Sequence, residues 1–101
     1  MKVTIFDVTP AELTFLKERL NGCEIIATSA KIQDEKTVDE SCEIISIFTQ
    51  SVIDRAALGR FPNLKFIATR STGYDHIDLD VCREKNVKVA KVPRYGDITV
   101  A

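Results

Sequence analysis

The amino-acid sequence predicts an α/β fold, a five-stranded parallel sheet with helices on both faces. Short apolar runs typical of strands alternate with helix-like segments five times along the 101 residues. Such alternation favours parallel strands, because each crossover returns the chain to the end of the sheet where strands begin. Ile44–Phe48 is apolar except for Ser46, as expected for a strand buried on both faces.

The first strand is predicted at Lys2–Phe6, and the first helix follows it directly. Thr9 and Glu12 have the spacing of a capping box, and the residue after Thr9 is a proline, which suits the first helical position. Asn21 and Gly22 supply the stop signal. Three leucines recur on one helical face and should pack on the sheet: Leu13, Leu16 and Leu20.

The remaining strands are predicted at Glu24–Thr28, Ile44–Phe48, Leu64–Ala68 and Val87–Val92. Lys88 and Lys91 in the last of them suit an edge strand, because charged side chains discourage further pairing. The handedness of crossovers favours the strand order 2-1-3-4-5, a flavodoxin-like, doubly wound sheet. We expect one domain at residues 1–92, with 93–101 leaving it.

The remaining helices have clear caps, with one ambiguous region. Residues 31–42 favour at most a short helix with Val38 and Cys42 facing inward. Ser51–Leu58 begins with Ser-x-x-Asp, which predicts an N-terminal cap. Asp78 should cap the last helix, and Asn86 stands where a left-handed residue would end it.

Composition excludes several classes of partner. The formal net charge is −1, which gives no general attraction to nucleic acid or to an anionic membrane. No apolar run is long enough to span a bilayer, and the N-terminus has no signal-peptide pattern. The three cysteines lack C-x-x-C spacing, so we expect free thiols in a reducing cytoplasm and no metal site.

The turn at residues 71–75 is the best candidate site. It follows the predicted strand Leu64–Ala68, and ligands of open parallel sheets bind beyond the carboxyl ends of the strands. Thr72 and Gly73 are small, so their backbone N–H groups can approach a small anion. The alternative is an ordinary strand-to-helix turn in which Gly73 supplies a positive φ.

From Phe48 to Ala101 the chain resembles the substrate-binding (catalytic) domain of the NAD-dependent D-isomer-specific 2-hydroxyacid dehydrogenases. The run from Arg70 to Asp78, R-S-T-G-Y-D-H-I-D, fits the D-lactate dehydrogenase branch of that family. The blocks that bear the resemblance keep the order and spacing of the family: Asn63–Ile67, Arg70–Asp78, Val92–Gly96 and Thr99–Ala101.

The resemblance implies an oxidoreductase that transfers a hydride between NAD(H) and a small 2-keto or 2-hydroxy acid. In the family, an NAD-binding Rossmann domain follows and holds the arginine, histidine and glutamate of the chemistry. We therefore interpret the chain as a fragment of such an enzyme, inactive alone and homodimeric when full length. NAD binding is implied by resemblance only, because the four glycines are too dispersed for a dinucleotide fingerprint.

The resemblance also assigns roles to residues of this chain. The amides of Thr72 and Gly73, in the turn with Ser71, would bind the substrate carboxylate. Phe48 would contact the substrate side chain, with Gln50 and Ser51 at the cleft mouth. Tyr95 would donate to the carboxylate or else pack on the second domain, and Val100 would lie under the nicotinamide ring. These candidate residues are Phe48, Ser71, Thr72, Gly73, Tyr95 and Val100.

Two further residues of the turn have expected structural roles. Arg70 is expected to pair with Asp75 or Asp78, or to help orient the anion. His76 is the only histidine, but the resemblance places it in a structural turn, far from the family's catalytic histidine. Asp75 and Asp78 should brace the turn and the helix after it. Arg94 and Asp97 depart from the family pattern and have no assigned role.

Two other functions remain as alternatives. A receiver-like signalling domain has the same alternation, but it needs an aspartate after the third strand, where this chain has Phe48-Thr49-Gln50. The same family fold also includes co-repressor-like, non-catalytic binding domains.

Overall fold

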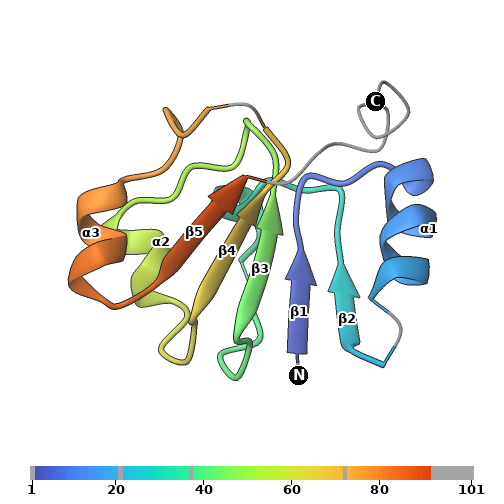
Figure 1. Ribbon diagram of the computed structural model, residues 1–101, viewed down its shortest axis with the longest axis horizontal. Helices are drawn as coiled ribbons and strands as arrows, with labels where there is room; N and C mark the ends of the chain where they lie inside the picture. The colour runs from blue at the N-terminus through green and yellow to red at the C-terminus, as the bar shows by residue number, and fades with distance from the viewer. Residues whose placement is uncertain (1, 21, 37, 72, 92–101) are drawn as a thin grey trace.

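The computed structural model describes residues 2–20, 22–36, 38–71 and 73–91, and a five-stranded parallel sheet runs through them (Figure 1). The strand order is β2-β1-β3-β4-β5, which confirms the predicted topology. The strands are shorter than predicted: β1 Lys2–Ile5, β2 Glu24–Ala27, β3 Ile44–Ile47, β4 Phe66–Thr69 and β5 Lys88–Lys91.

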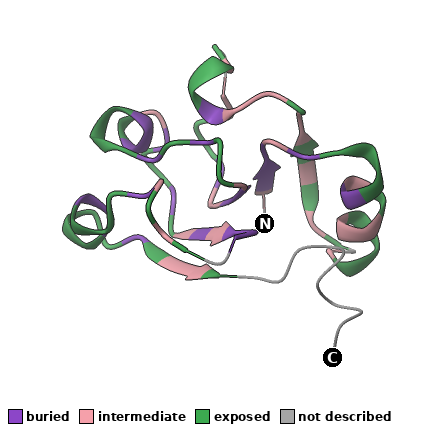
Figure 2. Ribbon diagram, turned by 90° about the horizontal axis from the view of Figure 1, so that it is seen from above, coloured by how far each residue is buried: buried purple, intermediate pink, exposed green. Residues whose placement is uncertain are grey.

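The helices cover opposite faces of this sheet, as predicted (Figure 2). Helix α1 lies against β1 and β2, whereas α2 and α3 cover the other face on the side of β4 and β5. The helical segments are α1 Pro10–Arg19, the 3₁₀ turn η1 Ile32–Asp34, α2 Arg55–Gly59 and α3 Leu79–Glu84.

The predicted caps of α1 and α3 are confirmed. The Glu12 N–H donates to Thr9 Oγ1 at 3.2 Å, and the Glu12 side chain accepts from the Thr9 N–H. The Val81 N–H donates to Asp78 Oδ1 at 3.2 Å. Asn86 ends this unit in the left-handed region with φ 59°. Each cap satisfies backbone donors that the helix itself leaves unpaired.

Two predictions about the loops were wrong. Helix α2 is capped by Asp54, which accepts from the Ala57 N–H at 2.9 Å, and not by Ser51. Ser51 is fully buried, and its hydroxyl accepts from the Ile32 N–H at 3.1 Å. Residues 38–42 form no helix, although Cys42 is buried and Val38 packs on the core.

The core has two parts, one on each face of the sheet. The larger part lies under α2 and α3, where Ile45, Ile47 and Ile67 are fully buried. The smaller part joins Val3 and Ile5 of β1 to the leucine face of α1. Burial of these aliphatic side chains is the main favourable term in the free energy of folding.

The position of β5 at the edge of the sheet and the free state of the cysteines match the sequence predictions. Strand β5 pairs only with β4 among the described residues, and both Lys88 and Lys91 are exposed. The cysteines are free, and burial followed by the charge of Asp78 raises the pKa of the Cys82 thiol. None of the helices in the described part of the chain has the length and apolar character that a membrane span requires.

Candidate functional site

The loops after β3 and β4 lie side by side at the carboxyl end of the sheet. These strands are neighbours, with Ile47 paired to Thr69 in a parallel register. The loop after β3 and the turn after β4 therefore leave the sheet at the same end. Between them is a pocket of about 310 Å³, lined by Thr49, Gly73, Asp75 and His76. This is the position at which open α/β sheets bind ligands.

Gly73 faces open space at this pocket. The alternative of a left-handed glycine stays a prediction, because the φ of Gly73 involves Thr72, which lies outside the described residues. Apart from its two chain neighbours, no atom of the described residues lies within 4 Å of a Cβ built on Gly73. Within the described residues, no hydrogen bond from the Gly73 N–H is found. Packing against the described residues therefore does not account for the glycine, and the space beside it is open.

Three candidate residues lie outside the described residues: Thr72, Tyr95 and Val100. Their roles stay predictions. Phe48 is half-buried and follows β3 directly, at the ligand-binding end of the sheet. Ser51 does not line the cleft mouth, because its side chain is buried against the loop at Ile32.

Ser71, Thr69 and His76 form a chain of hydrogen bonds beneath the pocket. Thr69 Oγ1 lies 2.7 Å from Ser71 Oγ and 2.8 Å from His76 Nε2. The Ser71 hydroxyl also donates to the Gly73 carbonyl at 2.8 Å. Thr69 is fully buried and Ser71 nearly so. Sequence reasoning missed Thr69 and Thr49, since only the alignment of β3 with β4 places them at the turn.

The His76 side chain is a neutral donor or acceptor near pH 7. Partial burial lowers its pKa, while the Asp75 and Asp7 carboxylates act in the opposite direction. The expected structural place of His76 in the turn is consistent with its bond to Thr69. Among the described residues, no group of three or more histidine, cysteine or acidic side chains forms a candidate metal site.

Arg70 does not pair with Asp75 or Asp78, and this prediction was wrong. Its side chain is 1% exposed, and Nη1 lies 3.4 Å from Glu12 Oε2 of α1. Side chains alternate across a strand, so Arg70 points to the α1 face, opposite to Thr69. Asp78 instead caps α3. Arg70 is therefore buried away from the pocket.

The Arg70 guanidinium joins four segments of the chain. Its Nε donates to Ser46 Oγ of β3 at 3.1 Å. Its Nη2 donates to the Phe6 carbonyl and, at 3.2 Å, to the Asp7 carbonyl after β1. Together with Glu12, these acceptors compensate the cost of removing the charge from water.

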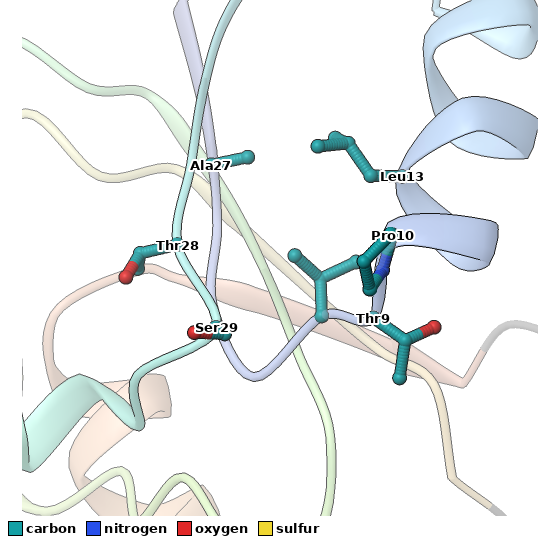
Figure 3. Close-up of a pocket in the computed structure, with 7 residues that line it drawn as sticks. Thr9, Pro10, Leu13, Ala27, Thr28 and Ser29 are labelled. Atoms are coloured by element: carbon teal, nitrogen blue, oxygen red, sulfur yellow. The ribbon is translucent and has the colours of Figure 1, made fainter.

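A second pocket, of about 190 Å³, lies between α1 and the end of β2 (Figure 3). Pro10 and Leu13 form one wall, and the Thr28 side chain points away from them. The Thr9 and Thr28 hydroxyls already accept from the N–H groups of Glu12 and Ala30. The pocket has no charged lining residue, so it is the weaker candidate.

The family comparison agrees with this geometry. The family model described as D-isomer specific 2-hydroxyacid dehydrogenase, catalytic domain, matches residues 3–101. The chain belongs to this family. The family assignment argues against the receiver-like alternative, and the chain's phenylalanine, threonine and glutamine after β3 agree with that.

Relatives support the same assignment over most of the chain. A 2-hydroxyacid dehydrogenase homolog of Zymomonas mobilis is 32% identical over 96 residues, covering 89% of this chain and 24% of that protein. A hydroxypyruvate reductase of Blautia hydrogenotrophica is 25% identical over 105 residues, covering 99% and 33%. The chain thus spans about a quarter to a third of the length of these two relatives.

The fold also matches a solved member of the family. The D-lactate dehydrogenase of Aquifex aeolicus, solved with NAD and lactic acid, superposes with a TM-score of 0.79 at 32% identity. The match covers 90% of this chain and 28% of the Aquifex chain.

Replacing Arg70 by methionine should destabilise the fold strongly. The variant leaves the Glu12 carboxylate buried without its partner, which costs about 3–5 kcal/mol in comparable sites. The matched control is Arg55→Met, which breaks the exposed Arg55–Glu84 pair and should cost less than about 1 kcal/mol. Urea unfolding of both variants measures the difference. Equal losses would contradict a structural role for the buried pair.

His76 should titrate below the usual histidine value of about 6.5. Because its pKa is lowered on folding, the neutral form stabilises the fold. This contribution is complete above the unfolded pKa and is lost as the pH falls through the folded pKa. Proton NMR of the single histidine gives the pKa, and unfolding at several pH values gives the slope. His76→Gln should lose that slope; an unchanged slope would refute the assignment.

Proposed function

We propose that this chain is the substrate-binding domain of an NAD-dependent D-2-hydroxyacid dehydrogenase. The complete enzyme would transfer a hydride between NAD(H) and a small 2-keto acid, with D-lactate-like acids as the substrate class. The observation that carries the proposal is the Gly73 amide N–H, which lies at a pocket beyond β4 and has no hydrogen-bond partner among the described residues, in a chain of this family. The Aquifex relative, solved with NAD and lactic acid, supports the same choice of ligands.

The chemistry of the pocket suits a carboxylate. A backbone N–H donates to an anion with no loss of side-chain entropy, and a site partly shielded from water strengthens the bond. Gly73, with Thr72 beside it, would fix the acid group so that the neighbouring carbonyl carbon faces the cofactor. Ser71 would hold the turn, and Phe48 and Tyr95 would border the rest of the substrate.

The remaining machinery belongs to a second domain in this proposal. Residues 1–92 form the substrate domain, and 93–101 begin the crossover. The residues of this chain do not fit NAD, because its glycines lie far apart and make no phosphate-binding turn. The dinucleotide, the carboxylate-binding arginine and the acid/base histidine therefore come from the second domain, apart from Val100 near the nicotinamide. The complete enzyme would be a cytoplasmic homodimer.

The 101-residue chain should bind small 2-keto acids weakly and should not turn them over. NMR titration with oxamate, an unreactive analogue of pyruvate, should shift the Gly73 amide resonance. Mixed with NADH and pyruvate, the chain should leave the absorbance of NADH unchanged. Oxidation of NADH by the purified chain would refute this division of labour, and absence of any shift would refute acid binding.

Gly73→Ala should reduce acid binding without destabilising the fold. Apart from its chain neighbours, the methyl group meets no atom of the described residues, so the free energy of unfolding should stay nearly unchanged. The same methyl group would occupy the space proposed for the ligand. Gly59→Ala is the matched control, because it also meets no atom but lies in α2, away from the pocket. Equal oxamate affinity of the two variants would contradict the proposed site.

A further inference from the structure

The hydrogen bonds beneath the pocket have only one consistent direction. The Gly73 carbonyl can only accept, so the single proton of the Ser71 hydroxyl is committed to it. At the next contact, 2.7 Å long, Ser71 Oγ must accept, and the single proton of Thr69 is committed in turn. At the last contact, 2.8 Å long, Thr69 Oγ1 must accept, so His76 Nε2 must donate. Counting protons therefore assigns the Nε2–H tautomer to neutral His76.

Two members of this hydrogen-bond chain, Thr69 and His76, are fixed to the fold. Thr69 is the last residue of β4 and pairs in register with Ile47 and Lys91. At His76, the backbone carbonyl accepts from the Ile53 N–H at 2.9 Å. Ile53 and Ile77 form a parallel bridge there. The His76 ring thus donates from a fixed backbone to a fixed hydroxyl.

The turn lies between these two anchors. The bond from the Ser71 hydroxyl to the Gly73 carbonyl closes a ring that contains the peptide bond preceding Gly73. The N–H of that peptide is the one proposed to bind the acid. While the Thr69–Ser71 contact is kept, the Ser71 hydroxyl can donate to Gly73 only if Thr69 donates to Ser71 Oγ. Thr69 is free to do so when His76 Nε2 is the donor at the other contact, so the orientation of the Gly73 peptide depends on His76.

We propose that His76 is a positioning residue for acid binding: its Nε2–H, acting through Thr69 and Ser71, sets the orientation of the Gly73 peptide. The proposal deepens the proposed function and depends on it. His76 also lines the pocket, while Nδ1 has no hydrogen-bond partner among the described residues. The charged groups that act on it there are the Asp75 and Asp7 carboxylates.

Amide substitutions separate this role from simple space filling. In His76→Gln the amide nitrogen can take the position of Nε2 and keep the donor. In His76→Asn the shorter side chain places its amide near Nδ1, and the bond to Thr69 is lost. Thr69→Val breaks the same chain of bonds at its middle with nearly unchanged shape, and Thr69→Ser preserves it.

The experiment measures oxamate affinity and heat unfolding for the 101-residue chain and these four variants. His76→Gln and Thr69→Ser should bind like the parent. His76→Asn and Thr69→Val should lose about tenfold in affinity, the effect of one hydrogen bond of ordinary strength. The Gly73 amide resonance should move in the same two variants even without oxamate. Equal losses in the glutamine and asparagine variants, once those that unfold at the assay temperature are set aside, would overturn the proposal.

Nitrogen NMR of the imidazole gives an answer that needs no ligand. The free parent chain above the His76 pKa should have the proton on Nε2, and a proton on Nδ1 would overturn the proposal. Absence of oxamate binding by the parent would overturn the proposed function together with the binding role of His76. The tautomer and the Gly73 resonance would still decide whether the hydrogen-bond chain controls the turn, so the two failures are distinguishable.

Discussion

The buried ion pair between Arg70 and Glu12 is the constraint on which the ligand-binding end of this domain depends. Arg70 immediately precedes the turn, and its guanidinium contacts α1, β3 and the loop after β1 at once. A buried pair of this kind contributes little net stability, because desolvation offsets most of the attraction. What it contributes is position, since moving the guanidinium away would leave the buried Glu12 carboxylate without its cationic partner. The start of the turn is thereby fixed relative to three other segments.

Thr69 and Arg70 point to opposite faces of the sheet and therefore have different roles. Arg70 holds the strand from the α1 side, whereas Thr69 points to the face covered by α2 and α3 and begins the polar contacts to Ser71 and His76. If the pairing register of β4 shifted by one residue, its side chains would exchange faces, and Arg70 would point into the polar network. The parallel pairing of Ile47 with Thr69 prevents this. Strand register thus decides which groups surround Gly73.

The features that were predictable from the sequence are the local ones. The capping box at Thr9 and Glu12, the left-handed Asn86 and the edge lysines follow from spacing within a few residues, and the strand order follows from alternation and handedness. The errors concern partners distant in the chain. Ser51 bonds to a loop 19 residues away, and Arg70 bonds to Glu12, 58 residues away. Sequence proximity favoured Asp75 and Asp78 as partners of Arg70, but the direction of the side chain from the sheet decided otherwise.

The burial of Arg70 also bears on how an acid would be held. The lining of the pocket is Thr49, Gly73, Asp75 and His76, which includes a carboxylate and a histidine with a lowered pKa but no permanent cation. Near it, the Lys91 ammonium lies over the Tyr74 ring, 5.3 Å from its centroid. Neutral backbone donors opposed by one negative charge can orient an anion but bind it weakly. Tight binding therefore requires a positive charge from outside the lining of this pocket. That requirement agrees with the proposed arginine on a second domain.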